Sequence, residues 1–182
     1  VNLTGGALDN LNYFWIIVFM TIESSFIPFP SEVVMIPAAY MAAAEGQMSI
    51  PMIITCGTTG ALFGALINYA LAYYLGRPIV YRFANSRFGH MCLIDQEKVE
   101  KAEAYFYKHG VISTLIGRLI PAIRQLISIP AGLSKMNIWK FMIYTCLGAG
   151  IWNAVLVGIG LVFHSQIGKE ELIAKISHYS HI

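Results

Sequence analysis

Two arginines in an apolar run constrain this chain more than any other feature. Arg118 and Arg124 lie six residues apart within residues 117–134, GRLIPAIRQLISIPAGLS, and Pro121 lies between them. An arginine at the centre of a bilayer costs roughly 2.5 kcal/mol or more, and a guanidinium in a soluble core would also need an acidic partner. The fold must therefore bring compensating negative charge to these two side chains.

The composition indicates that this run belongs to a membrane protein. Of the 182 residues, 57% are hydrophobic and only 12% are charged, and the mean hydropathy is +0.62. A soluble domain carries about 25% charged residues. We therefore expect an all-α integral membrane protein with one domain over residues 1–182. Two stretches, residues 50–76 and 138–163, are long and apolar enough to cross the bilayer as helices.

Two further apolar segments are too interrupted to cross. Residues 11–44 contain two arms of about twelve residues, each about 18 Å of helix against a hydrocarbon core of about 30 Å. The polar tip between the arms, residues 23–32, holds two glutamates and two prolines: Glu23, Glu32, Pro28 and Pro30. This pattern predicts a re-entrant hairpin, with one long span kinked at the prolines as the alternative. Residues 111–134, with Pro121 and the arginines, predict a second re-entrant hairpin.

The linker between the halves, residues 77–109, is strongly polar and basic. By the positive-inside tendency we expect it to be cytoplasmic. Asp95 can cap a helix that ends near His109, with Gly110 as its stop. An apolar stripe in this helix consists of Val99, Ala102 and Phe106. The stripe predicts an amphipathic helix that lies on the membrane surface or on the domain. We expect the acids to form a solvated face: Asp95, Glu97, Glu100 and Glu103. The tail, residues 164–182, is mixed and polar.

The order of these elements suggests an internal repeat. Each half is a broken hairpin followed by a glycine-rich span with one asparagine, Asn68 in the first and Asn153 in the second. Both ends of the linker would lie on the cytoplasmic side of the membrane. The first half would therefore end, and the second half begin, on that side, so the two halves would have opposite orientations, as in the inverted repeats of secondary transporters. The glycines of the first span have the spacing that lets another helix approach closely, and Asn68 is expected to hydrogen-bond between helices.

Inverted symmetry would bring the two hairpin tips together near the midplane. Glu23 and Glu32 would then face Arg118 and Arg124. Arginine stays protonated when desolvated and its fork of donors suits a phosphate, whereas glutamates at such a tip can exchange protons or act as counter-ions. One interpretation is a site that exchanges an internal carboxylate for an external anion. The alternative is a salt-bridge cluster that only locks the hairpins together.

At these residues the chain resembles the DedA family of bacterial membrane proteins, whose domain is also called the SNARE-associated or VTT domain. The family's arginine motif matches Arg118-Leu-Ile-Pro121-Ala-Ile-Arg124 and the following Ala131-Gly132, and its glycine-rich span ending in Gly-Arg matches residues 60–77. The acidic first hairpin is similar to residues 23–32. The chain departs from the pattern at Ser31-Glu32, where the family often has an Asp after Gly.

This resemblance implies lipid movement across the bacterial plasma (inner) membrane by a multi-pass protein, with undecaprenyl phosphate as the substrate and coupling to protons. It implies that Arg118 and Arg124 bind the lipid phosphate, while Glu23 and Glu32 carry protons or act as counter-ions. Six residues would support the site: Pro28, Pro30, Pro121, Asn68, Arg77 and Asn153. The alternatives are translocation or scrambling of glycerophospholipids such as phosphatidylethanolamine, proton-coupled transport of a small molecule or cation, and a structural scaffold.

Enzymatic function is disfavoured by the motifs. The chain has no HExxH, no GxSxG and no paired-Asp arrangement. We expect no catalytic residue, no metal and no cofactor apart from the proton motive force. The expected partners are the lipid substrate and the bilayer, not nucleic acid, and the small-residue faces permit a homodimer without requiring one.

Overall fold

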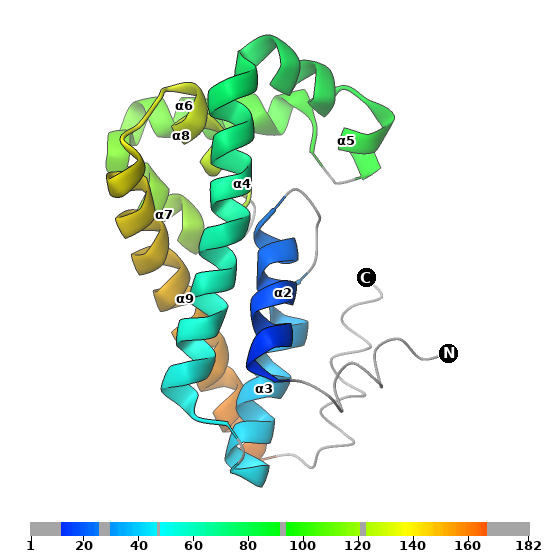
Figure 1. The fold of residues 1–182 in the computed structure, drawn as a ribbon, viewed down its shortest axis with the longest axis vertical. Helices are drawn as coiled ribbons and strands as arrows, with labels where there is room; N and C mark the ends of the chain where they lie inside the picture. Colours follow the sequence, from blue (N-terminus) through cyan, green and yellow to red (C-terminus); the bar gives the residue numbers. More distant parts are fainter. Residues whose placement is uncertain (1–11, 26–29, 47, 92–93, 121–122, 167–182) are drawn as a thin grey trace.

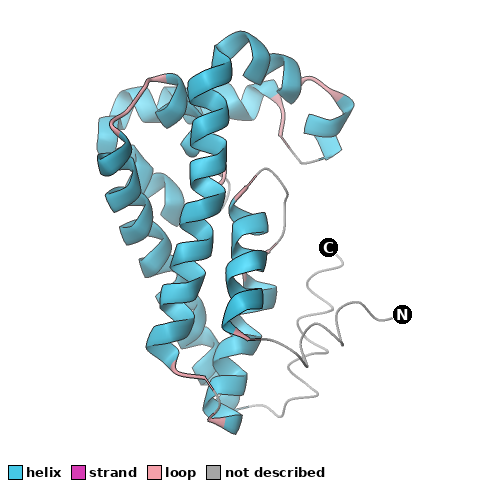
Figure 2. Cartoon of the chain, in the orientation of Figure 1, coloured by secondary structure: helices cyan, strands magenta, loops and turns pink. Residues whose placement is uncertain are grey.

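The computed structural model describes residues 12–25, 30–46, 48–91, 94–120 and 123–166 (Figure 1). Within these ranges the chain is all-α, as predicted, and Figure 2 shows helices joined by short loops without any strand. The helices are α2 (Tyr13–Ser24), α3 (Glu32–Glu45), α4 (Ile50–Ala84), α5 (Arg87–Met91), α6 (Gln96–His109), the 3-10 turn η1 (Gly110–Ile112), α7 (Ser113–Leu119), α8 (Ser128–Leu133) and α9 (Ile138–Gln166).

Helices α4 and α9 are the two long elements, and both are long and apolar enough to cross a membrane. The helical path of α4 is interrupted at Gly76, which has φ 70° and ψ 175°. An L side chain rarely adopts this positive φ, so glycine permits the break. The apolar part of α4 therefore ends at the beginning of the basic linker.

Apolar side chains of both long helices point outward. Large hydrophobic residues recur at helical spacing and remain exposed: Phe63, Ile67 and Leu71 on α4, and Ile143, Leu147, Ile151 and Val155 on α9. A soluble protein rarely leaves continuous apolar rows of this kind in water, whereas the hydrocarbon core of a bilayer accommodates them at no cost. The exposed rows agree with a membrane protein.

The four short helices pack on the long ones in a crossed pattern. Helix α2 packs along α4, whereas α3, which follows it in the chain, packs along α9. In the second half, α7 packs along α9 and α8 packs along α4. In Figure 1, α2 and α3 flank the lower part of the long helices while α7 and α8 flank the upper part. The C-terminal end of α2 and the turn after α7 consequently meet between them.

Glycine makes the α2–α4 contact close. A Cβ on Gly60 would lie 2.5 Å from the backbone oxygen of Ile17, and a Cβ on Gly64 would collide with the backbone oxygen of Thr21. The glycine spacing in this span thus does allow another helix to approach, and that helix is α2. Close backbone approach replaces the hydrophobic effect, which cannot hold helices together within lipid.

The linker helix α6 confirms its predicted cap. The side chain of Asp95 accepts a hydrogen bond from the backbone N–H of Lys98, and Gly110 ends the helix with φ 63°. The predicted apolar stripe, Val99, Ala102 and Phe106, is buried. Helix α6 packs against α8, so it rests on the domain and supports the second pair of short helices.

The prediction of a fully solvated acidic face was wrong at Glu103. This side chain is buried, and its Oε1 lies 3.0 Å from Nε of Arg77. The hydroxyl of Tyr81 donates to its other oxygen. Glu103 follows Ala102 directly and lies four residues after Val99, so it shares the edge of the buried face, where Arg77 supplies the compensating charge.

Candidate functional site

A buried ion pair joins the two halves where the short helices meet. Glu23 lies in the last turn of α2, and Arg124 lies in the turn after α7. The Nη2 atom of Arg124 is 2.5 Å from Oε1 of Glu23, and the two side chains are 13% and 4% exposed. The hydroxyl of Ser24 donates to the other oxygen of Glu23, at 2.9 Å. The carboxylate is thus held by both a charge and a hydroxyl.

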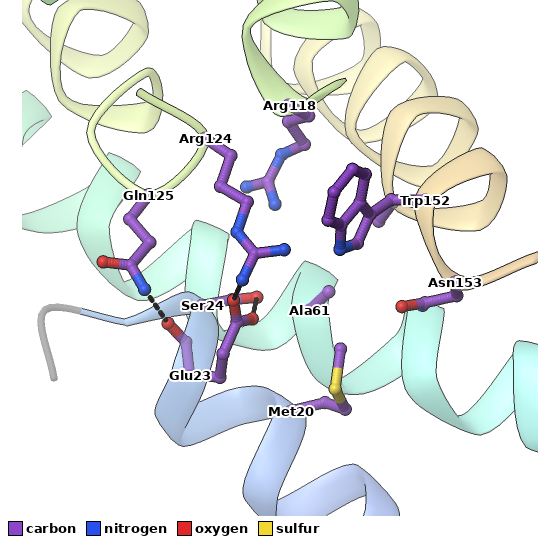
Figure 3. Close-up of a pocket in the computed structure, with 10 residues that line it drawn as sticks. Met20, Glu23, Ser24, Ala61, Arg118, Arg124, Gln125, Trp152 and Asn153 are labelled. Atoms are coloured by element: carbon purple, nitrogen blue, oxygen red, sulfur yellow. Dashed lines mark hydrogen bonds and ion pairs between the residues drawn. The ribbon is translucent and has the colours of Figure 1, made fainter. Parts of the chain in front are cut away.

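Arg118 faces the same space from the last turn of α7 (Figure 3). Its side chain is 5% exposed, and its Nη2 donates to the hydroxyl of Ser128 at 3.2 Å. Among the described residues it forms no ion pair within 4 Å, and its Nε has no hydrogen-bond partner. The cluster therefore holds two guanidiniums and one carboxylate, and that carboxylate pairs with Arg124 alone, which leaves an excess of positive charge at a buried point.

Neutral hydrogen bonds also tie the two halves together. Nε2 of Gln125 donates to the backbone oxygen of Glu23 at 3.0 Å. Nδ2 of Asn68 lies 3.3 Å from the backbone oxygen of Ser24 and 3.4 Å from that of Gln125. The expectation that Asn68 hydrogen-bonds between helices is confirmed, and its partners belong to both halves.

Helix α9 contributes the remaining wall. The guanidinium carbon of Arg124 lies 5.2 Å from the ring centroid of Trp152, which is a cation–π distance. Nδ2 of Asn153 donates to the hydroxyl of Thr58 on α4 at 3.3 Å. Asn153 is 1% exposed, and its Oδ1 has no partner among the described residues.

These groups surround a small cavity, drawn in Figure 3. Ten residues line it: Met20, Glu23, Ser24, Ala61, Arg118, Arg124, Gln125, Ala149, Trp152 and Asn153. Its volume is about 20 Å³, whereas a cavity needs roughly 10–15 Å³ to hold one water molecule. The cavity is therefore large enough for about one water molecule, and Glu23 occupies the position beside Arg124.

The other residues singled out in the sequence lie elsewhere. Glu32 is the first residue of α3, partly buried and outside the cavity lining, and Pro30 precedes it at the surface. Arg77 lies past the break in α4, where it pairs with Glu103 and contacts Tyr107. The remaining two, Pro28 and Pro121, fall outside the described residues. The structure thus brings together Glu23, Arg118, Arg124 and Asn153, with Asn68 bridging beside them.

A metal-binding arrangement is not found in the described ranges, where no group of three or more His, Cys, Asp and Glu side chains comes together. The charged hydrogen-bond donors that line the cavity are guanidiniums, which can bind an anion, and its carboxylate is paired with Arg124.

Comparison with known proteins identifies the family. The model of the VTT domain matches residues 27–162, a stretch that contains both arginines and the whole cavity apart from the α2 residues. This chain belongs to the VTT domain family. The predicted resemblance to the DedA family is thereby confirmed.

Relatives of this VTT domain have several descriptions. An alkaline phosphatase-like protein of Lactococcus lactis is 38% identical over 153 residues, 84% of this chain and 71% of that protein. The uncharacterized membrane protein YkoX of Bacillus subtilis is 39% identical over 155 residues, 85% of this chain and 66% of its own length. Undecaprenyl phosphate transporter A of the same organism is 31% identical over 167 residues, 92% of this chain and 79% of its length. No solved structure matches the chain. With its two apolar helices, this VTT domain is a membrane protein.

Sequence reasoning overlooked three polar residues of this VTT domain cavity, Ser24, Gln125 and Trp152. Gln125 directly follows Arg124 in an apolar run, and Trp152 lies in the middle of α9 rather than near an end. Tryptophan in membrane helices prefers the interface, so a mid-span tryptophan beside Asn153 was a usable signal for a polar interior site.

Proposed function

We propose that this protein is a translocase for a lipid phosphate, with undecaprenyl phosphate as the substrate, in the plasma membrane of a bacterium. The observation that carries the proposal is the buried cluster in which Arg124 pairs with Glu23 while Arg118, also buried, lies beside them without an ion pair among the described residues. A relative named undecaprenyl phosphate transporter A aligns over 92% of the chain and supports this substrate. The polyprenyl tail stays in the bilayer, so only the phosphate needs a polar route.

The proposed step is an exchange of anions. Glu23 holds Arg124 while no ligand is bound, because an unpaired buried guanidinium is costly. A lipid phosphate replaces the carboxylate and engages both arginines, whose planar forks suit phosphate oxygens. The displaced glutamate then takes a proton, which couples movement to the proton gradient, and Glu32 relays that proton from outside the cavity.

The proposed architecture is a pair of inverted repeats, each with a re-entrant hairpin and a spanning helix. The crossed packing supports it: the first arm of each hairpin, α2 or α7, packs on the spanning helix of its own half, and the second arm, α3 or α8, packs on the other spanning helix. A twofold operation that exchanges the halves would reproduce all four contacts. Such symmetry places the site at the junction of the repeats, near the midplane.

The test is transbilayer movement in liposomes that contain the purified protein and a labelled prenyl phosphate. We expect faster movement than in protein-free liposomes, and loss of the acceleration in Arg118→Lys and Arg124→Lys, because an ammonium keeps the charge but not the fork. Free phosphate is measured in the same samples, since one relative is named alkaline phosphatase-like. Absence of acceleration, or release of phosphate without movement, would refute the proposal.

A further inference from the structure

Three polar atoms that line the cavity have no use in the pairing of Glu23 with Arg124. They are Nε of Arg118, Nε1 of Trp152 and Oδ1 of Asn153, and each is buried without a hydrogen-bond partner among the described residues. Buried polar atoms are nearly always paired. Three unpaired ones around a single cavity therefore indicate a ligand that pairs them.

We infer that these atoms form a subsite selective for a phosphomonoester, in which Trp152 donates to a phosphate oxygen and Asn153 accepts from the phosphate hydroxyl. The inference rests on the proposed function and narrows its substrate class. Within this site Arg118 supplies charge, whereas Trp152 and Asn153 supply hydrogen bonds that depend on the protonation and esterification of the phosphate.

Trp152 is suited to the donor role by its position. The indole N–H can only donate, and Figure 3 shows the indole nitrogen between the guanidinium of Arg124 and the side chain of Asn153. The ring also lies under the guanidinium of Arg124, at 5.2 Å. When a ligand displaces Glu23, this ring still holds Arg124 in place, so the donor and the cation remain together.

Asn153 is suited to the acceptor role because its amide is already oriented. Its Nδ2 donates to Thr58, which turns Oδ1 into the cavity, as Figure 3 shows. An acceptor among phosphate-binding donors would repel a fully ionised oxygen, so it needs a ligand hydroxyl. A phosphomonoester can present such a hydroxyl, because its second ionisation occurs at roughly pH 6.

A phosphodiester lacks this hydroxyl. Glycerophospholipids with a head-group alcohol, such as phosphatidylethanolamine, carry organic groups on two phosphate oxygens, so the acceptor of Asn153 would remain unpaired opposite a negatively charged oxygen. Sites built around a buried hydrogen bond reject ligands that cannot form it, by large factors. The cavity therefore favours a prenyl monophosphate over the more abundant diester lipids of the same bilayer.

The experiment measures binding of farnesyl phosphate and of its methyl ester by calorimetry, with the full chain in nanodiscs. The two ligands share a tail, and only the first can present a P–OH. We expect the monoester to bind at least roughly tenfold more tightly to the unmodified protein.

Trp152→Phe keeps the ring and removes the N–H, so it lowers the affinity for both ligands by roughly tenfold and leaves the ratio of the two affinities unchanged. Trp139→Phe, at an exposed position on α9, is the matched control and changes neither affinity.

Asn153→Leu gives the decisive contrast, because it weakens the monoester alone and brings the ratio of affinities close to one. If the ratio persists in this variant, the methyl group is excluded by its size and the acceptor role is wrong. Equal binding of both ligands to the unmodified protein also overturns the inference, with no dependence on a folded variant. If neither substitution changes either affinity, the atoms bind only water. Transport in liposomes that does not distinguish the monoester from the diester refutes this inference alone. Absence of any transport refutes the proposed function.

Discussion

Replacement of Glu23 by glutamine tests the proposed exchange of anions most directly. In the structure the carboxylate of Glu23 lies 2.5 Å from Arg124, at the position that the proposed exchange gives to the phosphate. A ligand must therefore compete with the protein's own carboxylate. Glu23→Gln keeps the shape and the oxygen acceptor but removes the competing charge, so we expect anion binding to become tighter although the site has lost an ionisable group.

The magnitude follows from the contacts. A hydrogen bond to a charged group contributes about 1.5–3 kcal/mol, roughly twice the contribution of a neutral one. The amide of glutamine keeps the neutral part, so the ligand displaces a contact weaker by about 1 kcal/mol. That difference corresponds to about fivefold tighter binding. This fivefold gain in affinity is a lower bound, because the substitution also removes the repulsion between an ionised Glu23 and the phosphate.

The same substitution should lower the stability of the unliganded protein. Removing one partner of a buried ion pair costs about 3–5 kcal/mol, reduced here because glutamine still accepts a hydrogen bond and Arg124 is 13% exposed. Added prenyl phosphate should restore the melting temperature by binding the folded state alone. The unusual signature is a protein that is less stable without ligand yet binds it more tightly.

The assay is calorimetry with farnesyl phosphate in nanodiscs, together with thermal melting in the same samples. Glu97→Gln is the control, because Glu97 is an exposed acid on α6 that does not line the cavity. The affinity of this variant should match that of the unmodified protein. Weaker or unchanged binding in Glu23→Gln, or an equal gain in Glu97→Gln, would refute the idea that Glu23 occupies the anion position.

Three further predictions concern the scaffold. Gly60→Ala should lower the free energy of unfolding by about 1–3 kcal/mol, because its Cβ would lie 2.5 Å from a backbone oxygen of α2, whereas Gly158→Ala, with nothing within 4 Å, should change the melting temperature little. Glu103→Gln should weaken the attachment of α6 by about 1 kcal/mol, since its partner Arg77 is half-exposed, and should speed hydrogen exchange in α6. The backbone N–H of Lys98, which hydrogen-bonds to Asp95 at the start of α6, lowers the pKa of that carboxyl below its ordinary value. The cap therefore stabilises α6 above about pH 4, and this stabilisation is lost as the pH falls further. Hydrogen exchange in α6 should show this pH dependence in the unmodified protein and not in Asp95→Asn.

Local signals in the sequence sufficed for the two spanning helices and for α6, but not for α5 (Arg87–Met91) or for the continuation of α4 to Ala84. The two long helices were predictable because uncharged runs of that length have few other structures, and α6 was predictable from its cap at Asp95 and its stop at Gly110. These features depend on neighbours within a few residues. Burial of Glu103 was not predictable in the same way, because its partner Arg77 is 26 residues distant and meets it only after the break at Gly76.

The cavity was predictable in its charges but not in its pairing. Two glutamates and two arginines indicated an ionic site, yet nothing local distinguishes Glu23 from Glu32. The difference arises from packing: α2 ends beside the turn that carries Arg124, whereas α3 starts outside the cavity lining and continues along α9. Trp152 joins the site for the same reason, since only the arrangement of α9 turns its ring toward Arg124.

The contacts where the halves meet fall into two physically different groups, and the difference bears on how an anion could enter. The ion pair of Glu23 with Arg124 can be exchanged for a ligand, because a phosphate offers the same charge. The hydrogen bonds from Gln125 and Asn68 go to backbone oxygens, which no anion can replace. Each contributes about 0.5–1.5 kcal/mol, so together they are comparable to the ionic contact that a ligand would displace. The proposed exchange of the anion would move the carboxylate of Glu23, while the hydrogen bonds from Gln125 and Asn68 to backbone oxygens keep the two halves joined. Separation of the halves is a distinct event, which must break these neutral bonds whether or not the site is charged.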